Sequence, residues 1–130
     1  MVEAIRLRYF LFACDCAAVV VFVCFWFYTG PTLAQAPRLL PIALWNAMPF
    51  VALHAASHYI GRTPARTRPT MIVIAIVIAA STFVYGRLLL STVRASADSY
   101  EPNLIWLFAP AVLLVFVAVG SLVTMFVRVN

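Results

Sequence analysis

The segment LIWLFAPAVLLVFVAVGSLVTMFV, residues 104–127, contains no charged side chain and decides the class of this protein. A helix needs ~20 mostly apolar residues to cross the ~30 Å hydrocarbon core of a bilayer, and this segment supplies them. Three similar apolar runs precede it, at residues 9–28, 39–60 and 71–90. We therefore predict an all-α protein, a bundle of four transmembrane helices.

The composition of the whole chain agrees with this prediction. Hydrophobic residues make up 65% of it and the mean hydropathy is +1.04, which leaves too little polar sequence to cover a soluble core. Four helices at about 9–28, 39–60, 71–90 and 104–127 use most of the chain, so we expect residues 1–130 to form a single membrane domain. We find no catalytic, nucleotide-binding or cofactor motif, and we expect neither enzyme activity nor a cofactor.

The first apolar run has features of both a signal peptide and a membrane span. Arg6 and Arg8 precede it, as in the basic start of a signal peptide. The run is longer than the usual roughly 7–15 apolar residues and contains Asp15, so we interpret it as a retained span. The three cysteines, Cys14, Cys16 and Cys24, all lie within this run, and we interpret them as packing residues rather than as a disulfide framework.

The nine arginines, with no lysine beside them, indicate how the helices are oriented. In membrane proteins, basic residues gather on the cytoplasmic side near the ends of the spans, so we interpret them as topology signals and expect no nucleic-acid partner. With both termini in the cytoplasm, the outer side holds only Arg38, Arg87 and Arg94. The cytoplasmic side then holds the other six, Arg6, Arg8, Arg62, Arg66, Arg68 and Arg128. We therefore predict cytoplasmic termini, in a bacterial inner membrane given the Arg-, Ala- and Val-rich composition.

Aromatic residues favour the same orientation. Trp26, Phe27 and Tyr28 end the first run, and Trp106 lies early in the fourth. Because Trp and Tyr are enriched at membrane–water interfaces, we expect these residues at the outer interface.

Three ionisable side chains fall inside the apolar runs, and each is a candidate functional residue because a charge in hydrocarbon is costly. Asp15 lies about 10 Å beyond Arg8, and His54 about 12 Å before Arg62, at 1.5 Å per helical residue. If the first two spans form an antiparallel hairpin, Asp15 and His54 reach the same level. His58 lies one turn from His54 on the same face. We predict a hydrogen bond or ion pair between Asp15 and His54, with His58 nearby.

Three interpretations of this polar cluster stay open. It can hold the helices together, since polar contacts between membrane helices contribute about 1 kcal/mol each. It can act as a proton or cation relay, a role that suits a carboxylate beside a histidine. It can bind a metal, because His54 and His58 have the i, i+4 spacing of two imidazole ligands and Asp15 supplies a third.

Small residues mark faces where helices approach closely. Asn46, in the middle of the second run, is expected to donate a hydrogen bond to a neighbouring helix. We expect the small residues either to pack inside the bundle or to contact a partner; they are Ala43 with Ala47, Ala52 with Ala56, and Gly120 with Thr124.

Two segments carry a resemblance to known proteins. The second run closes in the basic loop HYIGRTPARTRP (residues 58–69), and an acidic loop leads into NLIWLFAP (residues 103–110). From Leu44 onward, about two thirds of the chain, the sequence resembles uncharacterised small bacterial four-helix inner-membrane proteins. The resemblance brings no catalytic residues. In size and shape the chain is also similar to four-span immunity proteins encoded beside bacterial toxins.

Two transporter families share single features with the chain. Small multidrug transporters place a glutamate in their first span, where this chain has Asp15 in a different local pattern. Polyprenyl-glycan flippases share the start Arg8-Tyr9-Phe10 but have an Asn–Arg signature that is absent here. We therefore expect a non-enzymatic accessory or immunity-type subunit that contacts the lipid bilayer and another membrane protein, or a second copy of itself. The alternative is a small oligomeric proton-coupled transporter with an Asp15/His54 relay.

Overall fold

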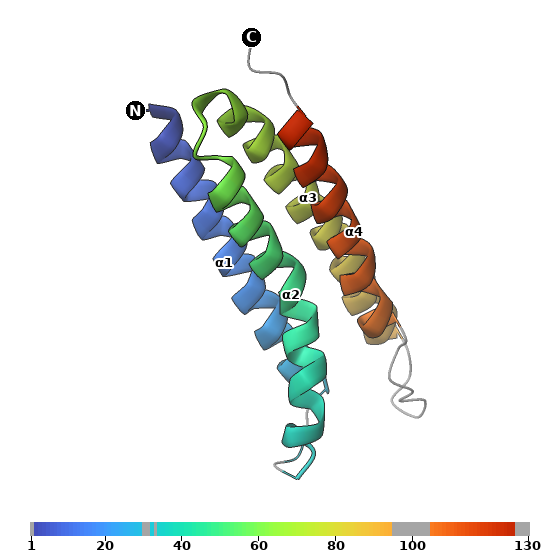
Figure 1. Cartoon of the computed structure of the whole chain (residues 1–130). Helices are drawn as coiled ribbons and strands as arrows, with labels where there is room; N and C mark the ends of the chain where they lie inside the picture. The colour runs from blue at the N-terminus through green and yellow to red at the C-terminus, as the bar shows by residue number, and fades with distance from the viewer. Residues whose placement is uncertain (1, 30–31, 33, 95–104, 127–130) are drawn as a thin grey trace.

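A computed structural model of the chain describes residues 2–29, 32, 34–94 and 105–126, and their regular structure is entirely α-helical (Figure 1). The helices are α1 (Val2–Thr29), α2 (Ala36–Ile60), α3 (Pro64–Arg94) and α4 (Ile105–Phe126). All four are long and apolar enough to cross a membrane. The prediction of an all-α, multi-pass membrane protein is confirmed in the number, length and apolar character of these helices.

The helices extend beyond the apolar runs that predicted them. Helix α1 begins at Val2 rather than Tyr9, and α3 begins at Pro64 rather than Met71, which reduces the expected loop to a turn at residues 61–63. Hydropathy marks only the part of a helix that lies in hydrocarbon, whereas backbone hydrogen bonding continues into the polar flanks. With 31 residues, α3 is about 46 Å long and exceeds the ~30 Å apolar layer. Its arginine-bearing first turns therefore project from that layer.

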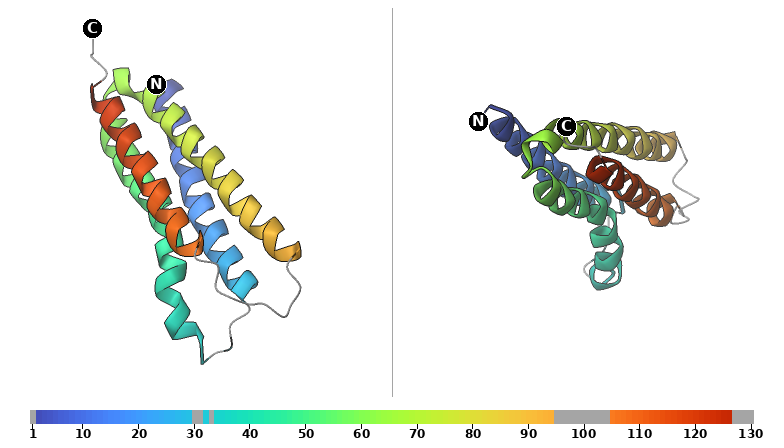
Figure 2. Two further views of the ribbon diagram at one scale, coloured as in Figure 1. Left: turned by 90° about the vertical axis from the view of Figure 1, so that its right-hand side faces the viewer. Right: turned by 45° about the horizontal axis from the view of Figure 1, so that its top comes forward.

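Consecutive helices run antiparallel, and the four form a bundle (Figures 1 and 2). Helices α1 and α4 each pack along both α2 and α3, so α1 and α4 occupy opposite corners. The start of α1, the α2/α3 turn and the end of α4 lie together at one end (Figure 1). We call this the arginine-rich end, because it carries Arg6, Arg8, Arg62, Arg66 and Arg68.

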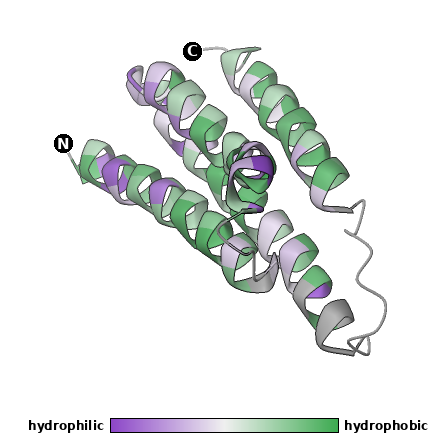
Figure 3. Cartoon of the chain, turned by 90° about the horizontal axis from the view of Figure 1, so that it is seen from below, coloured by the Kyte–Doolittle hydropathy of each residue, from purple (hydrophilic) through white to green (hydrophobic). Residues whose placement is uncertain are grey.

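Most residues of the four helices are apolar, as the green colour along the ribbons in Figure 3 shows. Large hydrophobic side chains on every helix are exposed, including Phe12, Val51, Ile76 and Phe108. Such a surface suits hydrocarbon rather than water as the surrounding solvent.

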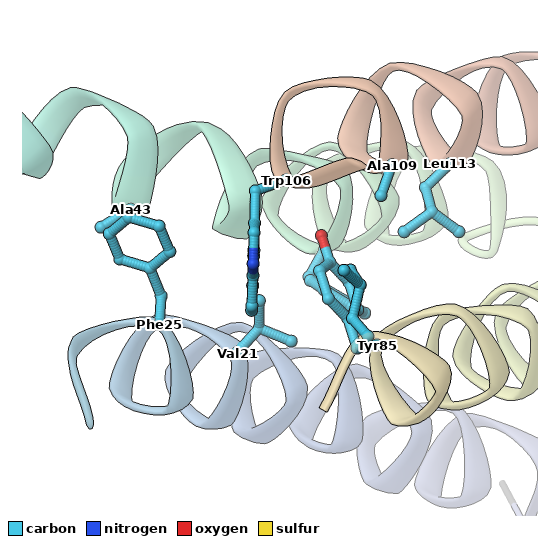
Figure 4. Close-up of a cluster of buried hydrophobic side chains, with 9 residues drawn as sticks. Val21, Phe25, Ala43, Tyr85, Trp106, Ala109 and Leu113 are labelled. Carbon is cyan, nitrogen blue, oxygen red and sulfur yellow. The ribbon is translucent and has the colours of Figure 1, made fainter. Parts of the chain in front are cut away.

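Two clusters of buried side chains form the core. The cluster nearer the arginine-rich end includes Leu7, Leu53 and Ile74. The cluster toward the opposite end is centred on Trp106, which stands between Phe25 and Tyr85 (Figure 4), with ring centroids 5.4 and 5.6 Å away. Offset and edge-on aromatic pairs of this kind stabilise a core beyond the area that they bury.

Trp106 lies at the start of α4, away from the arginine-rich end, and only 6% of the residue is exposed, so its ring faces the bundle and not the lipid. Ala43 and Ala109, two small residues, belong to the same cluster. Trp106 is therefore a core residue of the bundle.

Several of the small residues predicted to lie at close approaches pack inside the bundle. Ala43 is fully buried, and Ala52 packs against the other core cluster. Gly120 admits Val73 of α3, since a Cβ built at Gly120 would lie 2.6 Å from Val73 Cγ1. Thr124 is buried and donates its hydroxyl hydrogen to the carbonyl oxygen of Gly120 at 2.8 Å. Ala47 and Ala56 are half-buried.

Candidate functional site

Asp15 of α1 and His54 of α2 face each other across the first helix hairpin. Oδ1 of Asp15 lies 2.8 Å from Nδ1 of His54, so the two side chains meet at one level as the residue count predicted. Nδ1 is itself shielded from solvent and has no regular hydrogen-bond partner among the described residues. The contact is therefore a close ion pair when His54 carries a proton.

This pair lies on the outside of the bundle. The side chain of Asp15 is 58% exposed and that of His54 is 36% exposed. Phe12 and Val19, one turn to either side of Asp15, are exposed, as is Val51 beside His54. We call these five residues the outward strip. It is an apolar helix surface with one polar pair at membrane depth.

His58 and Arg62 continue the polar groups of α2 toward the arginine-rich end. The rings of His54 and His58 are stacked with centroids 6.4 Å apart. Nη2 of Arg62 lies 3.1 Å from Nε2 of His58, and because arginine only donates, Nε2 is the acceptor in this contact. The guanidinium of Arg62 also lies 5.3 Å from the centroid of the Tyr59 ring. Asp15, His54, His58 and Arg62 thus form a row of polar groups.

A second intramembrane polar contact is buried in the core. Tyr85 of α3 donates its hydroxyl hydrogen to Oδ1 of Asn46 at 3.0 Å, and Nδ2 of Asn46 donates to the carbonyl oxygen of Ile42 at 2.8 Å. Asn46 was expected to donate to another helix, but between helices it accepts. Sequence reasoning did not identify Tyr85. The general need of a buried tyrosine hydroxyl for a partner is the only signal that pointed to it.

Two further hydrogen bonds join helices near the two ends of the bundle. Nε1 of Trp45 donates to the carbonyl oxygen of Leu107 at 2.9 Å, which joins α2 to α4. Nε of Arg68 donates to Oε1 of Glu3 at 2.8 Å and joins α3 to α1. The guanidinium of Arg87 lies over the ring of Phe83. The expected position of Arg128 lies outside the described residues.

The geometry does not favour the metal interpretation. No group of three or more His, Cys, Asp or Glu side chains is placed to hold a metal ion within the part of the chain that the structure describes. Cys14 is buried, Cys16 exposed and Cys24 half-buried, and all three are free thiols.

Comparison with known proteins gives no match to any protein family, curated protein or solved structure.

Proposed function

We propose that this chain is a bacterial inner-membrane protein with cytoplasmic termini that acts without catalysis, as an accessory or immunity-type subunit. It does so by packing the outward strip of α1 and α2 against a helix of another membrane protein. The observation that supports this proposal is the outward position of the Asp15–His54 pair.

The energetic argument starts from the cost of polar groups in hydrocarbon. A charged side chain at the centre of a membrane helix costs about 2.5–3.5 kcal/mol on insertion scales, and such residues almost always face a bundle interior or a water-filled cavity. Asp15 lies about 10 Å inside the apolar layer and is more than half exposed. A partner helix over the pair gives it the interior position that such residues normally have.

The surface around the pair suits a helix. Ala47, two turns before His54 on the same face of α2, is half-buried and allows a backbone to approach closely. Phe12, Val19 and Val51 supply apolar contacts on either side of the pair. The partner helix we expect is apolar, with one hydrogen-bonding side chain at the depth of Asp15.

Site-specific cross-linking in native membranes tests this proposal. A photoreactive amino acid replaces Val51 on the outward strip or, as the matched control, Ile76 on α3; these side chains are β-branched and 55% and 54% exposed. We expect one abundant protein cross-linked from position 51, none from position 76, and a several-fold lower yield in Asp15→Asn. Equal cross-linking from both positions, or a native mass spectrum with monomer alone, would contradict the proposal.

The second candidate function is proton-coupled transport by an oligomer of this chain. The row from Asp15 through His54 and His58 to Arg62 favours it, because these groups connect membrane depth with one end of the bundle. In the other direction neither 16–29 in α1 nor 39–53 in α2 contains a basic, acidic or histidine side chain. This one-sided row is why we place transport second. Loss of pH-driven solute flux in proteoliposomes of a folded Asp15→Asn variant, with self-cross-linking from position 51, would reverse that order.

A further inference from the structure

A cavity of about 230 Å³ lies between α1 and α3, away from the outward strip. Val20 and Cys24 of α1 and Ile78, Thr82 and Gly86 of α3 form its sides, and Trp106 also lines it. Val20 and Thr82 are exposed, so the cavity opens between these two helices onto the outside of the bundle. Val20 is nine residues, or about 14 Å, before the end of α1, which places the opening at the depth of the hydrocarbon layer.

The hydroxyl groups of the cavity wall are already engaged. The hydroxyl of Ser81 donates to the carbonyl oxygen of Val77, and that of Thr82 donates to Ile78 at 2.9 Å. The hydroxyl of Tyr85 donates to Asn46. Among the residues that the structure describes, no charged side chain lines the cavity. An apolar ligand is therefore the class that this wall can accept without loss of a hydrogen bond.

The volume of the cavity further restricts which apolar ligands fit. An apolar cavity of ~150 Å³ is large enough to bind benzene. Sites for whole drug-sized molecules usually begin at ~300 Å³. The present volume falls between them, and it opens where lipid tails supply the surroundings.

We propose that this cavity binds a section of the acyl chain of a bilayer lipid. The chain enters between Val20 and Thr82 and reaches the ring of Trp106. Gly86 provides the space, because a Cβ built there has no heavy atom within 4 Å, whereas a Cβ at Gly120 would strike Val73.

Fluorescence quenching by brominated lipids tests the proposal. In a Trp26→Phe, Trp45→Phe background, Trp106 is the sole tryptophan, and the protein is reconstituted in phosphatidylcholine with dibrominated acyl chains. We expect strong quenching of Trp106 although it is buried, and at least a twofold reduction in Gly86→Leu, whose side chain fills the cavity. Leucine is also a better helix former than glycine, so this variant should fold. Ala75→Leu, on an exposed position of α3 outside the cavity, is the matched control and should quench normally.

Two results would overturn the proposal. One is quenching that is the same in Gly86→Leu as in the parent. The other is Trp106 fluorescence that no position of bromine along the acyl chain reduces. The comparison of bromine positions needs no cavity variant, so it decides the matter even if Gly86→Leu does not fold. Quenching strongest with bromines in the middle of the chain would support the proposal.

Discussion

Tyr85 and Asn46 form a hydrogen bond of 3.0 Å that joins α3 to α2 through the buried centre of the bundle. Both residues are buried, with 7% and 0% of their surface exposed. The contact fixes the register of one helix hairpin against the other, because a shift of either helix would leave two polar groups unpaired in an apolar core.

Removal of the tyrosine hydroxyl is expected to weaken the fold. Tyr85→Phe leaves Oδ1 of Asn46 without its donor, and we expect a loss of about 1 kcal/mol in the free energy of unfolding in detergent. Tyr9→Phe, at an exposed position of α1, is the control and should have no effect. Equal stability of the two variants would mean that the hydrogen bond contributes nothing.

The close approach at Gly120 predicts a steric effect that a second change relieves. Gly120→Ala brings a Cβ to within 2.6 Å of Val73, and overpacking of this kind typically costs about 1–3 kcal/mol. Gly86→Ala, where the added Cβ meets no atom within 4 Å, should not destabilise the protein. Thermal unfolding in detergent measures both variants. If the double variant Gly120→Ala, Val73→Ala is no more stable than Gly120→Ala alone, the clash is not the cause.

Because Trp106 is buried, its substitution should destabilise the protein much more than substitution of an aromatic residue that faces lipid. Trp106→Ala removes the ring between Phe25 and Tyr85 and should cost about 3–5 kcal/mol, the usual range for a buried aromatic residue. Phe27→Ala, whose side chain is 86% exposed, should change the free energy of unfolding far less. Denaturant titration in the same detergent compares them, and similar losses would place Trp106 outside the core.

The ion pair between Glu3 and Arg68 is expected to contribute little. The side chain of Arg68 is 79% exposed, and pairs of this kind contribute about 0–1 kcal/mol because solvent screens them. Glu3→Gln should therefore leave the unfolding midpoint nearly unchanged at high and low salt. A large loss at low salt alone would show that the arginine-rich end depends on this contact.

The distribution of arginines predicts an orientation that reporter fusions can measure. A phosphatase that is active only outside the cytoplasm should be inactive when inserted at Thr63, in the turn at the arginine-rich end. The same insertion at Ala34, in the connection at the other end, should be active. The reverse pattern would place the termini outside and contradict the positive-inside assignment.

Part of the candidate site could be predicted by counting residues along the first two helices. The residue numbers of Asp15 and His54, measured from Arg8 and Arg62, put them at one level of an antiparallel hairpin, and their atoms meet at 2.8 Å. Counting along a helix gives depth well because the rise per residue is constant. It did not show that the pair faces outward, nor that Tyr85 would satisfy Asn46.

The amino-acid sequence by itself determined that four helices are long and apolar enough to cross a membrane, and at which level along its helix each polar side chain lies. Hydrocarbon offers no hydrogen-bond partners, so every backbone polar group in it must be satisfied within its own helix. The length and hydropathy of a segment are therefore enough to identify a spanning helix. Only the tertiary structure decided how each helix is rotated about its axis. Helices that are apolar on every side carry almost no sequence signal for an inward face, so side-chain packing buried Trp106 and Asn46 and left Asp15 exposed.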